Sequence, residues 1–543
     1  MKIPTERKAL LGIVVIGIIY FTLMIFPNFT GAKDINMLSI FEKDEFAQIN
    51  HVVRMLKSGD SLYDALRRFF VYLHYFYGYP FYFFSALMVF SYRLLAGADW
   101  GNNISVLMLL LRQLVSVLPM IVSVALMVEL QARRKSLFKA LGTVLFLLAI
   151  PAVIQNNFWW HPDSLAILLV VLIFFFIDKD AFNYGKCFYI AAFICGIAFS
   201  VKYSGAFFVL AIPVYLVWGV AAKKIVLQRA FILAISFVIV MILGLVISNP
   251  LLLVPQERAE IIATQQLQFV QTRTGYYTVN PDWNLTAEKI NRIVWPFYAH
   301  WFTLIIMLLG LVKGITSPRF RLLNVMILMY ILPYLFTVGT SSIRPLYFLP
   351  LIIPLGSSLV HLFPERISFG KDVWRQFTLQ KVNQLLFPVG VMILLLIQFG
   401  IYIQKDIQIY TDILHREERS ESIAFYHDIE QLLVEQNIDK QPLKIYRDPT
   451  AYVPPKPNYD ILMKWKLASY DYVNQHQPDL LLLEMAYVIE FIKPDVVESA
   501  VDPGDMLAWQ QFYGDAYQNQ LDGYSIFYQN EFGLALIHNE LLK

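Results

Sequence analysis

Cysteine and charge are both scarce in this chain of 543 residues. Cys187 and Cys195 are its two cysteines, and because both lie in one apolar segment they imply no disulfide framework. Charged residues make up 16% of the chain and hydrophobic residues 57%, whereas soluble domains carry roughly 25% charged residues. The net charge of +3 gives no sign of a nucleic-acid partner. The composition therefore predicts a polytopic membrane protein.

Common catalytic signatures are missing from the polar part of the chain, which begins after residue 403. This part has no glycine-rich phosphate loop, no His/Cys cluster with metal-ligand spacing and no serine-centred elbow. Its patterns predict a helix over 421–435 and strands over 443–446 and 479–483. We therefore predict a small extracytoplasmic α/β domain at 404–543. It either covers a site and contacts an acceptor, or is a structural appendage.

Hydrophobic runs recur through the rest of the chain, and a span needs about 20 such residues. The runs fall near 9–27, 104–130, 137–154, 164–178, 187–201, 203–221, 229–250, 296–313, 322–340, 345–362 and 385–403. If about eleven helices alternate from a cytoplasmic N-terminus, five groups of Lys and Arg all fall on the inner side, as the positive-inside rule requires. We therefore predict an all-α polytopic domain over 1–403.

The stretch 77–95 is apolar enough for a further span. Counting it as a crossing would move the cations near Arg133 to the outer side, against the positive-inside rule. We therefore interpret it as a juxtamembrane or re-entrant helix within a large first outer loop, 28–103. A second outer loop is predicted over 251–295.

Asp44 and Glu45 follow the first hydrophobic run closely and emerge on the predicted outer face. Adjacent carboxylates near a bilayer are costly unless they are solvated, paired or used. One interpretation is a base that acts on a substrate whose other half lies in lipid. The alternative is a cap for the helix that starts near Phe46. Arg112, near the outer end of the second run, is placed to pair with a carboxylate of the outer loop.

Further polar side chains stand at the predicted outer ends of other helices. They are His161, Asp163, Lys202, Tyr203 and Arg344. Cations hold phosphate, and a carboxylate can deprotonate an acceptor hydroxyl, so their coincidence on one face suits transfer from a lipid phosphate. Each also has an ordinary interpretation, such as a helix start for Asp163 or contact with headgroups for Lys202. The pair Trp159-Trp160 fits an interface belt better than a sugar platform.

The order of these features resembles the GT-C superfamily of polyprenyl-phosphate-dependent glycosyltransferases. It is most similar to the bacterial relatives of dolichyl-phosphate-mannose–protein mannosyltransferases, glycosyltransferase family 39. The matching segments are Phe41-Glu42-Lys43-Asp44-Glu45, Tyr77–Tyr82, His161-Pro162-Asp163-Ser164, Gly196–Gly205 and Asn249–Arg258. Two features depart from the family: the Tyr77 segment lacks its His and double Pro, and 404–543 does not look like the repeat domain of the eukaryotic enzymes.

The resemblance implies an inverting transfer from a lipid-monophosphate sugar on the outer face. Asp44 is then the general base and Glu45 its acidic neighbour. The substrate-binding residues predicted on this basis are His161, Asp163, Lys202, Tyr203 and Arg344, with the donor phosphate near Lys202 and Arg344. Some relatives in the superfamily use a divalent metal and others do not, so no cofactor is assigned and a divalent metal stays open.

The expected partners are a polyprenyl-phosphate-linked sugar donor, an acceptor that is a lipid, glycan or protein, and membrane lipids, with no nucleic acid. The resemblance and the lack of an endoplasmic-reticulum retention signal favour a bacterial inner membrane. Three alternatives stay open: a glycan polymerase or ligase that uses a lipid diphosphate, a secondary transporter, and a non-catalytic envelope assembly protein. The transporter fits less well because its polar groups would lie near mid-membrane.

Overall fold

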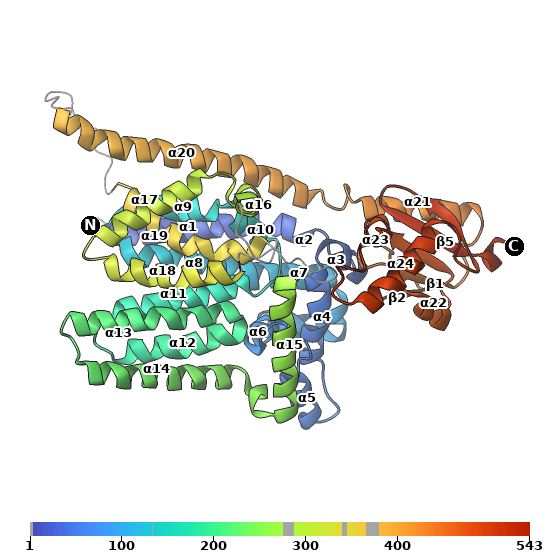
Figure 1. The fold of residues 1–543 in the computed structure, drawn as a ribbon, viewed down its shortest axis with the longest axis horizontal. Helices are drawn as coiled ribbons and strands as arrows, with labels where there is room; N and C mark the ends of the chain where they lie inside the picture. The colour runs from blue at the N-terminus through green and yellow to red at the C-terminus, as the bar shows by residue number, and fades with distance from the viewer. Residues whose placement is uncertain (1–3, 133, 275–286, 339–344, 365–378) are drawn as a thin grey trace.

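The computed structural model describes residues 4–132, 134–274, 287–338, 345–364 and 379–543. Within these ranges the chain forms a helical bundle and, at its C-terminal end, a small domain built on a β-sheet (Figure 1). The N-terminus lies at the end of the bundle farthest from this domain. We call the end that carries the domain the domain side of the bundle. The predicted fold class is confirmed.

Most helices of the bundle run roughly parallel to one another (Figure 1). Two helices depart from this direction: α10 is bent by 62° from α9, and α16 by 91° from α17. The elements of the bundle are α1 (Thr5–Leu23), α7 (Ile104–Leu111), η2 (Arg112–Val117), α8 (Leu118–Ala132), α9 (Leu137–Leu148), α10 (Pro151–Asn157), α11 (Asp163–Asp180), α12 (Lys186–Val201), η3 (Tyr203–Ala211), α13 (Ile212–Ala221), α14 (Leu227–Ser248), α16 (Ala287–Tyr298), α17 (Phe302–Thr316), α18 (Arg321–Val338), η5 (Pro345–Leu351), α19 (Ile352–Leu362) and α20 (Leu379–Leu414). Among the described residues, five helical stretches are long and apolar enough to cross a membrane, or up to seven if two bent pairs each count as one span. The number of about eleven spans stays a prediction.

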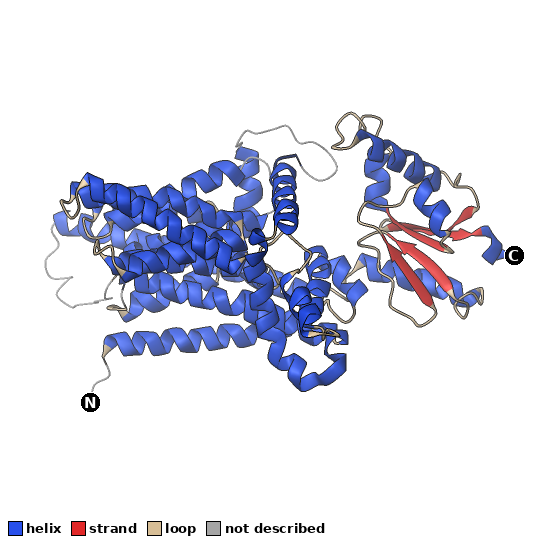
Figure 2. Cartoon of the chain, turned by 90° about the horizontal axis from the view of Figure 1, so that it is seen from below, coloured by secondary structure: helices blue, strands red, loops and turns tan. Residues whose placement is uncertain are grey.

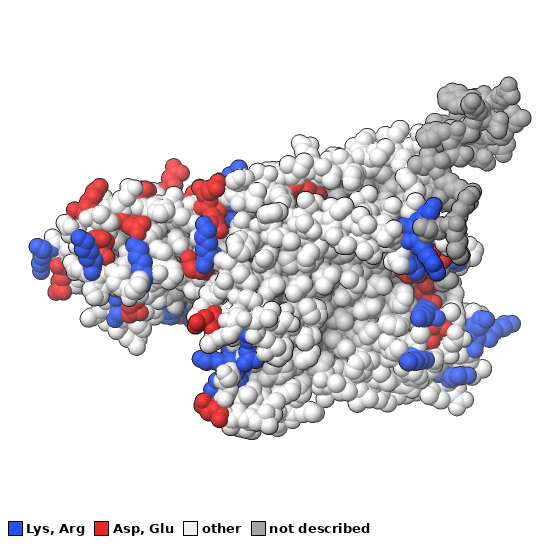
Figure 3. All heavy atoms as spheres, turned by 180° about the vertical axis from the view of Figure 1, so that it is seen from behind, with Lys and Arg blue, Asp and Glu red and all other residues white. Residues whose placement is uncertain are grey.

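The surface of the bundle fits a lipid bilayer. Figure 3 shows a broad belt with almost no charged side chains between two charged ends. Large apolar side chains are exposed on helices of the bundle, such as Ile18 at 61%, Phe231 at 68% and Ile247 at 64%. Apolar surface of this kind is costly in water and stable in lipid. The protein is therefore a multi-pass membrane protein.

Shorter helices form a layer on the domain side of the bundle, and α15 runs across the direction of the bundle helices (Figure 1). They are α2 (Ile25–Phe29), α3 (Ile35–Phe41), α4 (Lys43–Leu56), α5 (Leu62–Phe70), α6 (Tyr79–Ala96), η1 (Gly97–Asn102), η4 (Pro250–Leu253) and α15 (Pro255–Thr274). Their residues belong largely to the two predicted outer loops. Because α6 and η1 together are long and apolar enough for a span, the juxtamembrane position of 77–95 stays a prediction.

The C-terminal domain has a five-stranded sheet with the strand order β2-β1-β3-β5-β4. Its elements are α21 (Glu421–Glu435), β1 (Leu443–Arg447), β2 (Tyr459–Met463), α22 (Tyr470–His476), β3 (Leu480–Glu484), α23 (Met485–Phe491), α24 (Pro503–Tyr517), β4 (Tyr524–Gln529), β5 (Gly533–His538) and η7 (Asn539–Leu542). Strand β1 pairs in parallel with β2 and β3, whereas β5 is antiparallel to β3 and β4. Helices cover both faces of the sheet (Figure 2), which explains why every residue of β3 is buried.

The C-terminal domain is attached to the first outer loop as well as to α20. Helix α20 passes residue 403, the predicted domain boundary, and ends at Leu414. Met37 of α3 lies in the same buried cluster as Phe425 and Ile445 of the domain. Asn36 donates to the carbonyl of Val453 at 3.0 Å. Since α4 follows α3 almost at once, the domain holds the segment that leads to Asp44.

Candidate functional site

Asp44 and Glu45 lie in the first turn of α4, and neither caps it. The N-cap position is Glu42, whose side chain makes no capping hydrogen bond. The cap interpretation is therefore wrong, and the helix begins at Lys43, earlier than the predicted start near Phe46. The two carboxylates differ in surroundings: Asp44 is half-buried, whereas Glu45 is 0% exposed.

Glu45 is held by Arg112, the pairing that the sequence suggested. Arg112 donates from Nε to Glu45 Oε1 at 2.9 Å and from Nη2 to Oε2 at 2.5 Å, and both side chains are fully buried. The same guanidinium donates from Nη1 to the carbonyls of Asn28 and Thr30 at 2.9 and 3.0 Å. Arg112 opens the π-helical segment η2, a distortion that is frequent at functional sites. Glu45 thus acts as a positioning residue for α4.

Trp160 also binds Glu45 and connects it to α6. Its backbone N–H donates to Glu45 Oε1 at 2.7 Å, and its indole N–H donates to Ser85 Oγ at 3.0 Å. Its ring stacks on Phe81 with the centroids 5.4 Å apart. Because Trp160 is 0% exposed, the interpretation as part of an interface belt is wrong for it. It is a buried support between α4, α6 and the turn before α11.

His161 and Asp163, two residues apart before and at the start of α11, meet Lys202, 39 residues beyond Asp163, in one buried group. Lys202 donates from Nζ to Asp163 Oδ1 at 2.6 Å, and Asp163 Oδ2 is hydrogen-bonded to His161 Nδ1. The Tyr77 hydroxyl is 2.6 Å from His161 Nε2. The helix-start interpretation of Asp163 is also correct, because α11 begins there. Three predicted substrate-binding residues therefore form one hydrogen-bonded chain that ends at the first outer loop.

Burial lowers the pKa of two histidines in this region, His161 and His74. Burial lowers the pKa of His161 in spite of the opposing effect of Asp163. Burial and, to a smaller extent, the neighbouring His51 together lower the pKa of His74 to about 4. The negative charge of Asp44 opposes the shift at both His161 and His74, because it raises the pKa of each ring. A neutral His161 donates from Nδ1 to Asp163 and accepts from Tyr77 at Nε2.

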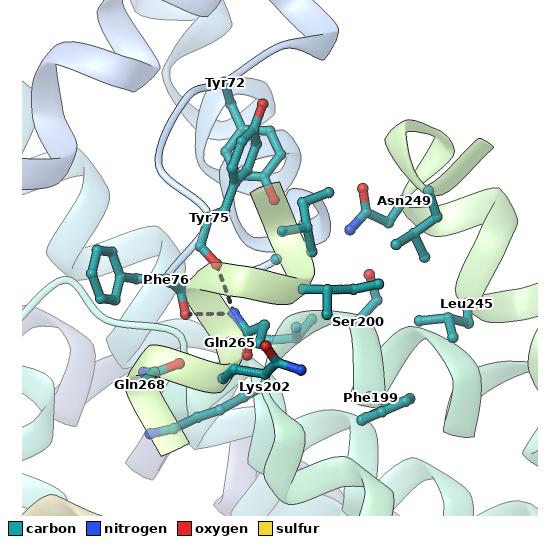
Figure 4. Close-up of a pocket in the computed structure, with 16 residues that line it drawn as sticks. Tyr72, Tyr75, Phe76, Phe199, Ser200, Lys202, Leu245, Asn249, Gln265 and Gln268 are labelled. Carbon is teal, nitrogen blue, oxygen red and sulfur yellow. Dashed lines mark hydrogen bonds between the residues drawn. The ribbon is translucent and has the colours of Figure 1, made fainter. Parts of the chain in front are cut away.

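A cavity of about 430 Å³ opens beside this group (Figure 4). Its walls come from the first outer loop, from the domain-side ends of α12 and α14, and from α15, and they are mainly apolar and aromatic. The lining residues are Tyr72, Tyr75, Phe76, Gly78, Phe199, Ser200, Val201, Lys202, Leu245, Asn249, Leu252, Ile261, Ile262, Gln265, Gln266 and Gln268. An apolar cavity with a few convergent polar groups is the usual form of a ligand site.

Two contacts hold the first outer loop against the helices that line the cavity. A Cβ added to Gly78 would lie 1.4 Å from the carbonyl oxygen of Ser200, so the loop approaches α12 here only as glycine. Gln265 of α15 donates from Nε2 to the carbonyl of Tyr75 at 2.6 Å (Figure 4). The two predicted outer loops therefore pack against each other around one cavity.

Two predicted residues are not placed. Arg344 lies outside the described residues, and for Tyr203 only the backbone, at the start of η3, is described. Among the described residues, no three His, Cys, Asp or Glu side chains gather as a metal site would require. Sequence reasoning assigned no role to Tyr77 or Gln265. Tyr77 stood in a segment that resembles the family, whereas nothing in the sequence distinguished Gln265 from its neighbours.

No protein-family model and no curated protein matches the sequence of this chain. Its structure is similar to two crystal structures of ArnT from Cupriavidus metallidurans. The one bound to undecaprenyl phosphate has a TM-score of 0.52 and 14% sequence identity, over 96% of this chain and 97% of that chain. The apo structure has a TM-score of 0.50 and 14% identity, over 97% of this chain and 98% of that chain. At this identity the likeness establishes the fold, and the chain therefore has the GT-C fold that its motifs predicted.

Proposed function

We propose that this protein is a membrane glycosyltransferase that moves a sugar from a polyprenyl-monophosphate donor to an acceptor hydroxyl, with inversion. The observation that carries the proposal is the mainly apolar cavity of about 430 Å³, whose wall includes Lys202 and four residues of the first outer loop, the segment that also carries Asp44. A lipid-linked phosphate needs this combination of an apolar wall and a fixed cation. The ArnT structure that holds undecaprenyl phosphate supports the same class of donor.

The donor phosphate is placed near Lys202 in this proposal. Asp163 holds the Lys202 ammonium at 2.6 Å, and the neutral His161 in turn orients Asp163. A phosphate that binds there would share the ammonium with Asp163. Charge that builds up on the departing phosphate is stabilised by a cation fixed in advance, so little acid catalysis is needed. Arg344 and Tyr203 stay proposed donor ligands on the basis of the family resemblance.

Asp44 is the proposed general base. The acceptor oxygen attacks the anomeric carbon, its proton passes to the Asp44 carboxylate, and the bond from that carbon to the phosphate oxygen breaks. The polyprenyl phosphate leaves with the bonding electrons. Glu45 cannot take this role while both of its oxygens are bound by Arg112, but it holds the first turn of α4 and therefore Asp44.

The acceptor is proposed to be a lipid, glycan or protein on the outer face of a bacterial inner membrane. In this orientation the N-terminus is cytoplasmic and the C-terminal domain extracytoplasmic. The charge distribution supports it, because the bundle end away from the domain shows mainly basic side chains (Figure 3). Lys223 and Lys224, between α13 and α14, and Arg229, in the first turn of α14, form one of the five basic groups predicted on the inner side.

The experiment compares the purified wild type in lipid with Asp44→Asn. Each protein is given a panel of polyprenyl-monophosphate sugars, and donor consumption is followed with envelope extract as the source of acceptor. We expect consumption by the wild type and a loss of about 10²-fold or more in Asp44→Asn, the usual size of a general-base contribution. Asp60→Asn, an exposed carboxylate of the same loop, is the matched control and should keep full activity.

Three results would decide against the proposal. Full activity of Asp44→Asn would show that Asp44 is not the general base. Consumption of lipid diphosphates alone would show that the protein is a polymerase or ligase. No consumption and no binding of any monophosphate donor would reject the donor class. A parallel arm with EDTA tests the divalent metal left open by the sequence.

A further inference from the structure

A second groove lies between α4, α5 and α6, and it shares no lining residue with the Lys202 cavity. Its volume is about 370 Å³. Met55 of α4, Leu66 and Phe69 of α5, and Phe83 and Phe90 of α6 supply its apolar walls. The groove is therefore a separate cavity, and a ligand could occupy it whether or not the Lys202 cavity is filled.

The rim of this groove carries two cations, Lys57 and Arg93. Lys57 is exposed and Arg93 half-buried. In the described part of the chain, no carboxylate lies within ion-pair distance of either of them. Arg68 nearby differs, because it pairs with Asp64 at 2.7 Å. The groove therefore combines an apolar interior with uncompensated positive charge at its rim.

The helices around the groove present apolar side chains to the outside. Helix α5 has no buried residue, and its Leu62 is 77% exposed. On α6, Leu94 and Leu95 are 66% and 88% exposed. Basic side chains gather where this corner of the molecule meets the uncharged belt (Figure 3). A short helix with strong polar and apolar faces and basic residues is typical of the membrane interface.

We propose that this groove binds one anionic phospholipid from the leaflet on the domain side. The lipid phosphate lies between Lys57 and Arg93, and one acyl chain enters between Leu66 and Phe90. Charge complementarity selects the headgroup, because neither rim cation has a counter-ion among the residues that the structure describes. The exposed apolar surface of α5 and α6 places the groove where acyl chains are present. A bound lipid would fix α5 and α6 against α4, the helix that carries Asp44.

The test uses the full-length protein in detergent with equal amounts of phosphatidylglycerol and phosphatidylcholine, and native mass spectrometry counts the lipid that stays bound. We expect the wild type to retain phosphatidylglycerol preferentially. Lys57→Gln and Arg93→Gln should each weaken its binding roughly five-fold, since one interfacial cation contributes about 1 kcal/mol. Arg67→Gln is the matched control, because Arg67 is an exposed cation of α5 that does not line the groove.

A second variant tests the acyl-chain half of the site. Leu87 lines the groove and is 52% exposed, so Leu87→Gln should fold and should reduce retention of both lipids. Equal retention of the two lipids by the wild type would overturn the proposal. So would unchanged retention of phosphatidylglycerol when Lys57 and Arg93 are both replaced, with size-exclusion chromatography showing that the double variant is folded.

Discussion

Arg112 is the residue on which the first outer loop depends most directly. Its guanidinium binds both carboxylate oxygens of Glu45 and two backbone carbonyls, and it is fully buried. Removing one partner of a buried ion pair leaves an uncompensated charge, which costs about 3–5 kcal/mol. We therefore expect Arg112→Met to lower the free energy of unfolding by about this amount.

The control for Arg112→Met is the double variant Arg112→Met/Glu45→Leu, in which neither charge remains. Replacing a whole buried pair with apolar side chains is far less costly than breaking it. Thermal unfolding in detergent should therefore show a smaller loss for the double variant than for the single one. Equal losses would mean that Arg112 stabilises the protein through packing alone.

His74 predicts a dependence of stability on pH. Burial lowers its pKa from 6.5 to about 4 in the folded protein. Between these values the unfolded chain binds a proton that the folded chain does not, so stability falls as the pH falls through this window. We expect His74→Gln to lose less stability on acidification than the wild type. His427→Gln, an exposed histidine of the C-terminal domain, is the control, and parallel losses in all three proteins would contradict the assignment.

At the scale of elements, the crossing of α12 and α14 is set by two glycines. A Cβ on Gly196 would lie 2.1 Å from the carbonyl oxygen of Met241, and one on Gly244 would lie 2.4 Å from that of Phe193. Small residues allow close approach of membrane helices. We expect Gly196→Ala to cost about 1–3 kcal/mol, the range for overpacking, and to lower the melting temperature.

Gly400→Ala provides the comparison for Gly196→Ala. Gly400 also lies inside a helix, α20, but nothing in the described structure lies within 4 Å of an added Cβ. Because alanine is the better helix former by up to about 1 kcal/mol, this variant should be neutral or more stable. A melting temperature that falls equally in both variants would show that close packing at Gly196 is not the cause.

At the scale of the whole molecule, the C-terminal domain packs against α3 of the first outer loop, the helix just before the one that carries Asp44. Asn36 of α3 donates to the carbonyl of Val453 at 3.0 Å and accepts from Arg447 Nη2 at 3.2 Å. Asn36→Ala should shift α3 and with it Asp44. Since a displacement of about 1 Å can cost up to about 10²-fold in rate, we expect a loss of about ten-fold or more in donor consumption.

The control for Asn36→Ala is Asn50→Ala, an exposed position on α4. Both variants should keep the wild-type melting temperature within a few degrees, because other contacts also join α3 to the domain, such as the hydrogen bond from the Tyr452 hydroxyl to Asp34 at 2.9 Å. Only Asn36→Ala should lower donor consumption. If Asn36→Ala keeps full activity, the contact with the C-terminal domain does not position Asp44.

Several features could be predicted from sequence because they follow from local patterns. Apolar runs indicate the bundle helices, including the short runs that became α11 and α12, and the composition change after residue 403 indicates the α/β domain. The helix predicted over 421–435 is α21. Bends were not predicted: the run 137–154 is two helices at 62°, and α16 and α17 meet at 91°. Such angles depend on packing partners that a hydropathy pattern does not contain.

Hydropathy and positive charge orient each helix, so the amino-acid sequence was enough to predict which residues lie at one end of the bundle. On this basis it indicated Asp44, His161, Asp163 and Lys202. The sequence suggested that Arg112 pairs with some carboxylate of the outer loop, but the folded structure was needed to show that this carboxylate is Glu45 and that Lys202 is bound by Asp163. The physical reason is that burial makes an unpaired charge costly. Which partner satisfies it depends on segments far apart in the chain.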